Sequence, residues 1–163
     1  MIKFQFATQN DLTKIVGTYN ASIPGRLATA DLEKVTVESK QKWFDDHNVV
    51  DRPLWIILFD EQYAGWMSFS SFYGRPAYQA TVEVSIYLEP LFHKKGIGKT
   101  ALQFAEIEAK KRRISTLLGF IFGHNEASIH LFQKAGYHKW AHLPEIANME
   151  GVLRDLIILG KKV

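Results

Sequence analysis

Residues 81–109 restrict the possible folds of this chain more than any other part of the sequence. TVEVSIYL (81–88) is rich in β-branched residues and stops at Glu89-Pro90, which predicts a strand. FHKKGIGKT (92–100) follows as a glycine-rich turn flanked by lysines. Apolar residues then recur at helical spacing, which predicts an amphipathic helix that begins inside the turn. A strand that feeds a helix through such a turn predicts unpaired backbone N–H groups at the start of that helix.

The rest of the chain alternates between strand and helix patterns. Strands are expected at residues 2–6, 54–59, 63–72, 115–122, 137–141 and 153–162, and further helices at about 8–19, after 36 and at 125–135. The order β-α-α-β-β-β-α-β-α-β-β predicts an α/β (α+β) fold with a mixed, mostly antiparallel central sheet flanked by helices. We expect residues 1–163 to form a single domain.

Composition excludes several classes of protein. The chain has no cysteine, so disulfides, thiolate metal sites and a cysteine nucleophile are excluded. It has no run of about 18 apolar residues and no signal-like amino terminus, so we expect a cytoplasmic protein without a membrane partner. The net charge of +3 is too small to indicate nucleic-acid binding. The six histidines lack close acidic partners, and no metal site is expected; His124 and His130 are expected at the surface.

The basic residues gather in one region. Two clusters, HKKGIGK (93–99) and KKRR (110–113), are close in sequence. They are either solvated faces or a local positive field for a polyanionic small molecule.

The glycine turn admits three interpretations. A P-loop needs a glycine at position 93, where His93 stands, and a later acidic residue for magnesium, which the strand at 115–122 lacks. Residues 96–101 fit the dinucleotide pattern G-x-G-x-x-A, but no acid follows at the ribose position. In the third interpretation the turn and the helix start bind a pyrophosphate, with Gly96 and Gly98 allowing close approach. A tight turn without a ligand is the structural alternative.

Two motifs in their order of occurrence favour the third interpretation. HKKGIG (93–98) resembles the Q/R-x-x-G-x-G/A motif of the GNAT acetyltransferase superfamily, with His93 in place of Gln or Arg. NEASIHLFQKAGY (125–137) resembles a second motif of that superfamily. Nearly the whole chain is similar to the phosphinothricin / methionine sulfoximine N-acetyltransferase branch. The resemblance implies acetyl transfer from acetyl-CoA to the amino group of a small amino acid or analogue, in a homodimer.

The resemblance also implies roles for individual residues. Glu83 becomes the general base, and apolar neighbours Val82, Val84 and Trp66 would raise its pKa. Backbone groups of the same strand would pair with pantetheine, with the Leu88 amide polarising the acetyl carbonyl. The implied cofactor-binding residues are Ile86, Tyr87, Leu88, Lys94, Lys95, Gly96, Ile97, Gly98, Lys99, Asn125 and Ser128.

The resemblance assigns the residues that bind the acceptor less specifically than those that bind the cofactor. Arg75 would bind the acceptor carboxylate, with Tyr78 and Phe72 forming one wall and the loop containing Thr29 another. Phe132 stands where many relatives have a tyrosine that protonates the leaving thiolate; a thiol pKa of about 8.5 makes unaided departure tolerable. Two rival functions stay open: a non-catalytic binding module for CoA or a metabolite, and an acetyltransferase for peptide or protein N-termini.

Overall fold

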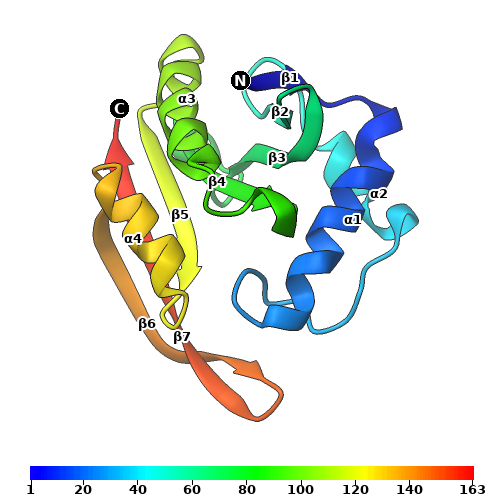
Figure 1. Cartoon of the computed structure of the whole chain (residues 1–163). Helices are drawn as coiled ribbons and strands as arrows, with labels where there is room; N and C mark the ends of the chain where they lie inside the picture. Colours follow the sequence, from blue (N-terminus) through cyan, green and yellow to red (C-terminus); the bar gives the residue numbers. More distant parts are fainter.

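A seven-stranded sheet crosses the structure, a computed structural model that describes residues 1–163, in the order β1-β2-β3-β4-β5-β7-β6 (Figure 1). Only β4 and β5 are parallel neighbours; all other pairs are antiparallel. The strands are β1 (Ile2–Phe6), β2 (Leu54–Phe59), β3 (Gln62–Ser71), β4 (Thr81–Leu88), β5 (Thr116–Phe122), β6 (His138–Met149) and β7 (Val152–Lys162). The helices are α1 (Leu12–Ser22), α2 (Val37–Asp45), α3 (Ile97–Lys111) and α4 (Glu126–Lys134). The predicted mixed, mostly antiparallel sheet flanked by helices is confirmed.

Helices cover both faces of the sheet: α1 and α2 lie on one side, and α3 and α4 on the other (Figure 1). Alternate residues of β2 supply the two cores. Trp55 and Ile57 belong to the large core with α3, whereas Leu54 and Ile56 belong to a smaller cluster with α1. A strand buried on both faces has no polar side, which explains why residues 54–59 form a continuous apolar run. The first four residues of this strand are buried within the chain.

β4 and β5 pair only at their beginnings, from Thr81 opposite Thr116 to Glu83 opposite Leu118. Past Glu83 the two strands separate, while β4 stays paired with β3 and β5 with β7. Figure 1 shows this divergence in the middle of the sheet. We call the gap between the two strands the fork. The edge of β4 that faces it has no partner strand beyond the residues already paired.

One predicted element is much longer than expected. The strand expected at residues 137–141 continues as β6 to Met149. Pro144 lies inside it, and Glu145 has a φ of 53°. The pairing with β7 shifts register between Leu143 and Ala147, so the proline sits in a bulge rather than in a regular ladder. No helix of the structure is long and apolar enough to cross a membrane.

Candidate functional site

The turn between β4 and α3 exposes backbone N–H groups. Lys94 (φ 60°) and Gly96 (φ 79°) both adopt left-handed conformations. Gly96 is the N-cap of α3, and the first helical hydrogen bond runs from the Thr100 N–H to the Gly96 carbonyl, at 3.2 Å. The N–H groups of residues 97–99 therefore lack a partner in the helix. A Cβ on Gly96 would meet no atom within 4 Å, so the space beside this helix start is open. This geometry suits an anionic phosphate oxygen.

Gly98 also meets a packing requirement. A Cβ at this position would lie 2.8 Å from Cδ2 of Leu131 on α4. The glycine therefore lets the start of α3 approach α4 closely. Lys94, Lys95 and Lys99 are all exposed, and the Lys95 ammonium lies 5.4 Å from the ring centroids of both Phe59 and Phe92.

His93, the residue that departs from the family motif, ties the turn to the end of β4. Its Nε2 donates a hydrogen bond to the Leu88 carbonyl, at 3.0 Å. The side chain therefore holds the backbone of the turn in place, which explains how a histidine is accommodated here.

Backbone groups of β4 point alternately toward β3 and toward the fork. The Glu89 N–H donates to the Ala64 carbonyl of β3 at 2.9 Å. Alternation then directs the N–H groups of Leu88 and Ile86 into the fork, and that of Tyr87 toward β3. Of the three residues proposed to bind by backbone groups, two present their N–H to the fork.

Glu83 is the last residue of β4 that still pairs with β5, so it lies at the root of the fork. Burial raises the pKa of its carboxyl above the ordinary 4.5. Of the expected apolar neighbours, Val82 and Val84 point into the core on the α3 side, and Trp66 pairs with Tyr87. The residues opposite Glu83 are Ser70 on β3 and Leu118 on β5.

Sequence reasoning missed His47, which follows α2 and reaches the strand residue opposite Glu83. Its Nδ1 donates to the Trp43 carbonyl at 2.7 Å, which leaves Nε2 as an acceptor 3.4 Å from the Ser70 hydroxyl. Burial lowers the pKa of His47, so the ring is held neutral. Nothing in the sequence pattern connects a residue at position 47 with one at position 83.

A bridging loop, residues 26–29, joins the two arms of the fork. On the β4 side, the Tyr87 hydroxyl donates to the Ala28 carbonyl at 3.0 Å. On the β5 side, the Asn125 Nδ2 donates to the Leu27 carbonyl at 3.2 Å, and the His124 Nε2 to the Arg26 carbonyl at 2.7 Å. His124, expected at the surface, is half-buried because it holds this loop.

Two predicted ligand residues have structural contacts in this region. The Asn125 Oδ1 caps α4 by accepting from the Ser128 N–H at 3.2 Å. The Thr29 hydroxyl lies 2.5 Å from the Tyr19 hydroxyl, and Asp31 also accepts from Tyr19. Burial, with this acid as a further cause, raises the pKa of Tyr19 to about 12.

Other predicted residues lie apart from these contacts. Arg75 and Tyr78 are exposed, and the Arg75 guanidinium forms no ion pair or hydrogen bond. Tyr78 packs edge-on against Phe72, with ring centroids 5.5 Å apart. Phe132 is buried in the core, where its ring lies against Gly119 and Tyr137. Its position therefore serves packing.

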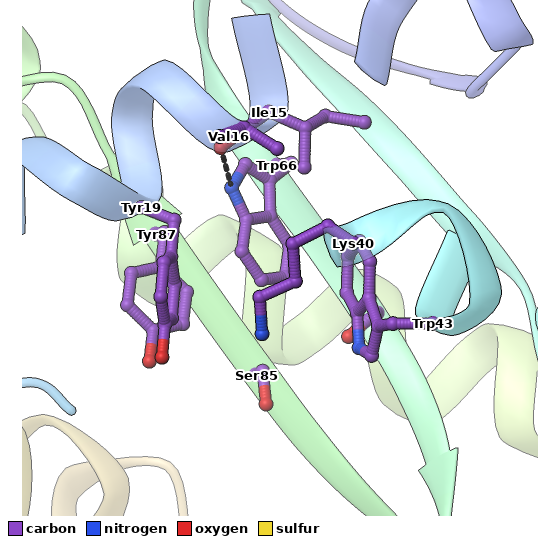
Figure 2. A pocket seen from close by; sticks show the side chains of 9 residues that line it. Ile15, Val16, Tyr19, Lys40, Trp43, Trp66, Ser85 and Tyr87 are labelled. Carbon is purple, nitrogen blue, oxygen red and sulfur yellow. Dashed lines mark hydrogen bonds between the residues drawn. The ribbon is translucent and has the colours of Figure 1, made fainter. Parts of the chain in front are cut away.

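The structure also contains a cavity that the sequence did not predict, on the α1–α2 side of the sheet (Figure 2). Its volume is about 150 Å³. It is lined by Ile15, Val16, Tyr19, Lys40, Trp43, Trp66, Ser68, Ser85 and Tyr87. The sequence contains the lining residues in separate elements, as a Lys-x-x-Trp pair on one helix and as alternate residues on two adjacent strands. No single motif therefore indicated the cavity.

The chain is similar to known proteins over most of its length. Residues 12–137 match the acetyltransferase (GNAT) family. YwnH of Bacillus subtilis (strain 168), provisionally named a phosphinothricin acetyltransferase, is 43% identical over 98% of both chains. The L-methionine sulfoximine/L-methionine sulfone acetyltransferase of Salmonella typhimurium is 24% identical over 95% of this chain and 91% of that protein.

Solved structures agree. A crystal structure of a provisionally named phosphinothricin N-acetyltransferase has a TM-score of 0.95 at 42% identity, over 99% of this chain and 98% of that one. A GNAT superfamily phosphinothricin acetyltransferase from Sinorhizobium meliloti, solved in complex with AcCoA, has a TM-score of 0.92 at 23% identity, over 99% and 88% of the two chains, and shows a shared fold. The family model covers most of the chain, and the resemblance read from the two motifs is confirmed: the chain belongs to the GNAT family of acetyltransferases.

Proposed function

We propose that this protein transfers the acetyl group of acetyl-CoA to the amino group of a small amino acid or analogue of the phosphinothricin / methionine sulfoximine type. The fork carries the proposal. It brings together a partly buried carboxylate with a raised pKa, free backbone N–H groups along β4, and the unpaired N–H groups of the turn. The names of the similar proteins support the acceptor class.

The residues present fit an extended thioester with a pyrophosphate. The turn would hold the pyrophosphate through the N–H groups of residues 97–99, with Lys94 and Lys99 adding positive charge. Gly96 leaves the open space that the oxygens need. Ile86 and Leu88 would bind the pantetheine arm through the free edge of β4.

The strand geometry revises one assignment. Successive residues rise about 3.3 Å, so the Leu88 N–H lies about 17 Å along the strand from Glu83. An amine in contact with Glu83 cannot attack a carbonyl held that far away. The Val84 N–H points the same way, but in a parallel ladder the pair of Glu83 with Leu118 uses the backbone groups that flank Glu83, so it is taken up by β5. The first free N–H that points into the fork belongs to Ile86, about 10 Å from Glu83. We therefore assign polarisation of the acetyl carbonyl to Ile86 and keep Leu88 for the pantetheine arm.

In the chemical step, Glu83 accepts a proton from the acceptor's ammonium, directly or through water. The neutral nitrogen then attacks the thioester carbonyl carbon while the Ile86 N–H stabilises the developing oxyanion. As the C–S bond breaks and the amide forms, the nitrogen loses its second proton, and that proton reaches the leaving thiolate through water, because Phe132 cannot donate one. Acetyl-CoA supplies the activated acetyl group and the leaving thiol.

Arg75 remains our proposed anchor for the acceptor carboxylate. Its guanidinium is unpaired, and it lies in the loop between the end of β3 and the start of β4. That loop meets the sheet on the amino-terminal side of Glu83. Tyr78 and Thr29 remain proposed acceptor contacts, and Asn125 and Ser128 proposed cofactor contacts.

The experiment is a thiol-release assay with acetyl-CoA and a panel of acceptors: the standard amino acids, phosphinothricin, methionine sulfoximine and methionine sulfone. Mass spectrometry identifies the product. We expect acceptor-dependent thiol release and an N-acetylated product for at least one oxygen-bearing analogue. Acetyl-CoA binding without release for any acceptor would instead favour a binding module.

We also propose a homodimer formed through the β6–β7 hairpin. Four large apolar side chains of this hairpin are exposed: Trp140, Ile146, Val152 and Leu153. Consecutive strand residues point to opposite faces, so Val152 and Leu153 are exposed on different faces of the hairpin, and exposed apolar side chains of this kind mark interaction surfaces. Light scattering coupled to size exclusion tests it: we expect twice the chain mass for the wild type and the single-chain mass for an Ile146→Glu, Leu153→Glu variant.

A further inference from the structure

The cavity between α1, α2, β3 and β4 has four aromatic walls. Tyr19 comes from α1, Trp43 from α2, Trp66 from β3 and Tyr87 from β4 (Figure 2). Their rings contact one another, with centroids 5.4 Å apart for Trp43 and Trp66, 4.6 Å for Trp66 and Tyr87, and 5.2 Å for Tyr19 and Tyr87. Rings locked in this way form a preformed slot for an apolar group.

The polar atoms of three of these four side chains already form hydrogen bonds to groups outside the cavity. The Trp66 Nε1 donates to the Ile15 carbonyl at 3.2 Å, as Figure 2 shows, and the Tyr87 hydroxyl donates to the bridging loop. The Tyr19 hydroxyl bonds to Thr29 and Asp31. These three rings therefore offer the cavity mainly their faces.

Lys40 is the one charged residue that lines the cavity, and its charge is uncompensated. Its ammonium forms no ion pair and no hydrogen bond. It faces the rings of Tyr19, with the centroid at 4.8 Å, and Trp43, at 5.9 Å. Lys42, two residues along the same helix, points to solvent and pairs with Asp46 at 3.0 Å. A cation held among rings without a carboxylate is available to an anionic or oxygen-bearing ligand.

Ser68 supplies a second, independent sign of a ligand. It is 1% exposed, lines the cavity, and its hydroxyl has no hydrogen-bond partner. Leaving a buried hydroxyl unpaired is unfavourable, so such groups are rare. Ser85, directly opposite on β4, also lines the cavity. The cavity thus combines apolar walls with hydrogen-bond donors and contains no carboxylate.

The cavity is next to the proposed base. Glu83 and Ser85 are two residues apart on β4 and share one face of the sheet, so their Cα atoms are separated by about 7 Å. Arg75 belongs to the loop that precedes β4, and the start of β4 lies on the opposite side of Glu83 from Ser85 along the strand. An acceptor whose amine meets Glu83 can therefore direct its carboxylate toward Arg75 and its side chain into the cavity.

We propose that this cavity is a specificity subsite for the acceptor's side chain and selects a short apolar stem that ends in an oxygen-bearing or anionic group. Tyr19, Trp43, Trp66 and Tyr87 would hold the stem, and Lys40 and Ser68 would bind the terminal oxygens. A carboxylate attached directly to the α-carbon would not need four rings or 150 Å³. The inference rests on the proposed function, because it concerns the same acceptor.

Methionine sulfone and methionine form a matched pair of acceptors that differ only in two oxygens on sulfur. The measured quantity is the ratio of their kcat/KM values. Loss of a hydrogen bond to a charged group predicts that Lys40→Met lowers this ratio about tenfold or more. Ser68→Ala should lower it about fivefold by the same reasoning. Lys42→Met makes the same chemical change on the same helix outside the cavity, and should leave the ratio unchanged.

Two outcomes are distinguishable. An unchanged ratio in Lys40→Met would overturn the subsite, whether kcat/KM stays the same for both acceptors or falls equally for both, as it would if Lys40 served only the fold. Failure of the wild type to acetylate any acceptor would refute the proposed function but not the cavity. Titration of tryptophan fluorescence with methionine sulfone still tests the cavity, since Trp43 and Trp66 line it: we expect saturable binding that Lys40→Met weakens about tenfold and Lys42→Met leaves unchanged.

Discussion

The two sides of the fork are built from different parts of the chain. The turn before α3 presents backbone N–H groups, and its chemistry depends on left-handed residues and open space. The α1–α2 side presents side chains from four separate elements, packed around a small cavity. A backbone site tolerates many side chains, whereas a side-chain site changes with every substitution. The turn therefore suits a cosubstrate common to a family, and the cavity suits an acceptor that varies among its members.

Glu83 stands between the two sides, and its replacement should have the largest effect. Glu83→Gln removes the base, so we expect kcat to fall about 10²- to 10⁴-fold. KM for acetyl-CoA should change little, because the backbone groups remain. Thiol release measures both quantities. Glu33→Gln, which alters an exposed loop carboxylate, should behave as wild type. Retention of activity within fivefold would refute the assignment.

The same substitution should stabilise the fold at high pH. Burial raises the pKa of Glu83 in the folded state above its unfolded value, so the native state favours the protonated carboxyl. Its contribution is present below the unfolded pKa and is lost as pH rises through the folded pKa. Gln carries no charge, so Glu83→Gln should raise Tm at pH 8 and have a smaller effect near pH 4. The acid limb of wild-type kcat/KM should correspondingly lie above pH 4.5.

Gly96→Ala tests the turn before α3, which presents backbone N–H groups, without changing the cavity on the α1–α2 side. The φ of 79° imposes about 1–2 kcal/mol of strain on an alanine, and the added Cβ enters the open space. We expect KM for acetyl-CoA to rise about tenfold, with kcat at saturation near the wild-type value. Gly151→Ala is the matched control, since Gly151 has a φ of 88° and open space in the β6–β7 turn. An equal rise of KM in both variants would assign the effect to general strain.

Asn125 tests whether a side chain contributes to the cofactor side. Asn125→Ala removes both the cap of α4 and the bond to Leu27, and should lower the unfolding free energy by about 1 kcal/mol. Asn125→Asp keeps the cap acceptor and should recover most of that stability. If Asn125 also contacts the cosubstrate through its amide, both variants raise KM for acetyl-CoA. If KM is unchanged in both, its role is structural.

His47→Gln should have the smallest effect, confined to acid stability. Burial lowers the pKa of His47 below 6.5, so the native state favours the neutral ring. The stability that the neutral ring provides is present above the unfolded pKa and is lost as pH falls through the folded pKa. Urea unfolding at pH 7.5 and pH 5 should show a smaller difference for the variant than for wild type. An unchanged difference would mean that another group controls acid stability.

Local sequence patterns predicted most of the fold because they report on local geometry. The alternation in residues 81–88 and the glycines at 96 and 98 placed β4, the turn and the start of α3 correctly. Pattern reasoning failed where a long-range contact decides, as at Pro144, where a bulge in the pairing with β7 lets β6 continue to Met149.

For the candidate site, too, the sequence predicted some features and missed those that depend on long-range contacts. The direction of the shift in the Glu83 pKa was expected from the sequence, and burial is its cause. Lys40, His47 and Ser68 were missed, because only tertiary packing brings α2 and β3 beside β4. A motif can indicate a backbone site, whereas a side-chain site requires knowledge of which elements meet.

The fork has one further consequence, for solubility. It turns β4 into an edge strand in the interior of a sheet, and unpaired edges pair readily with strands of other chains. Native proteins protect such edges with covering loops or short exposed lengths. The bridging loop, bonded to Tyr87 on one arm and to His124 and Asn125 on the other, closes the acceptor side of this edge. Tyr87, His124 and Asn125, which hold this loop, therefore also protect the unpaired edge of β4 from pairing with strands of other chains, while the rest of the edge stays free for the protein's own ligand.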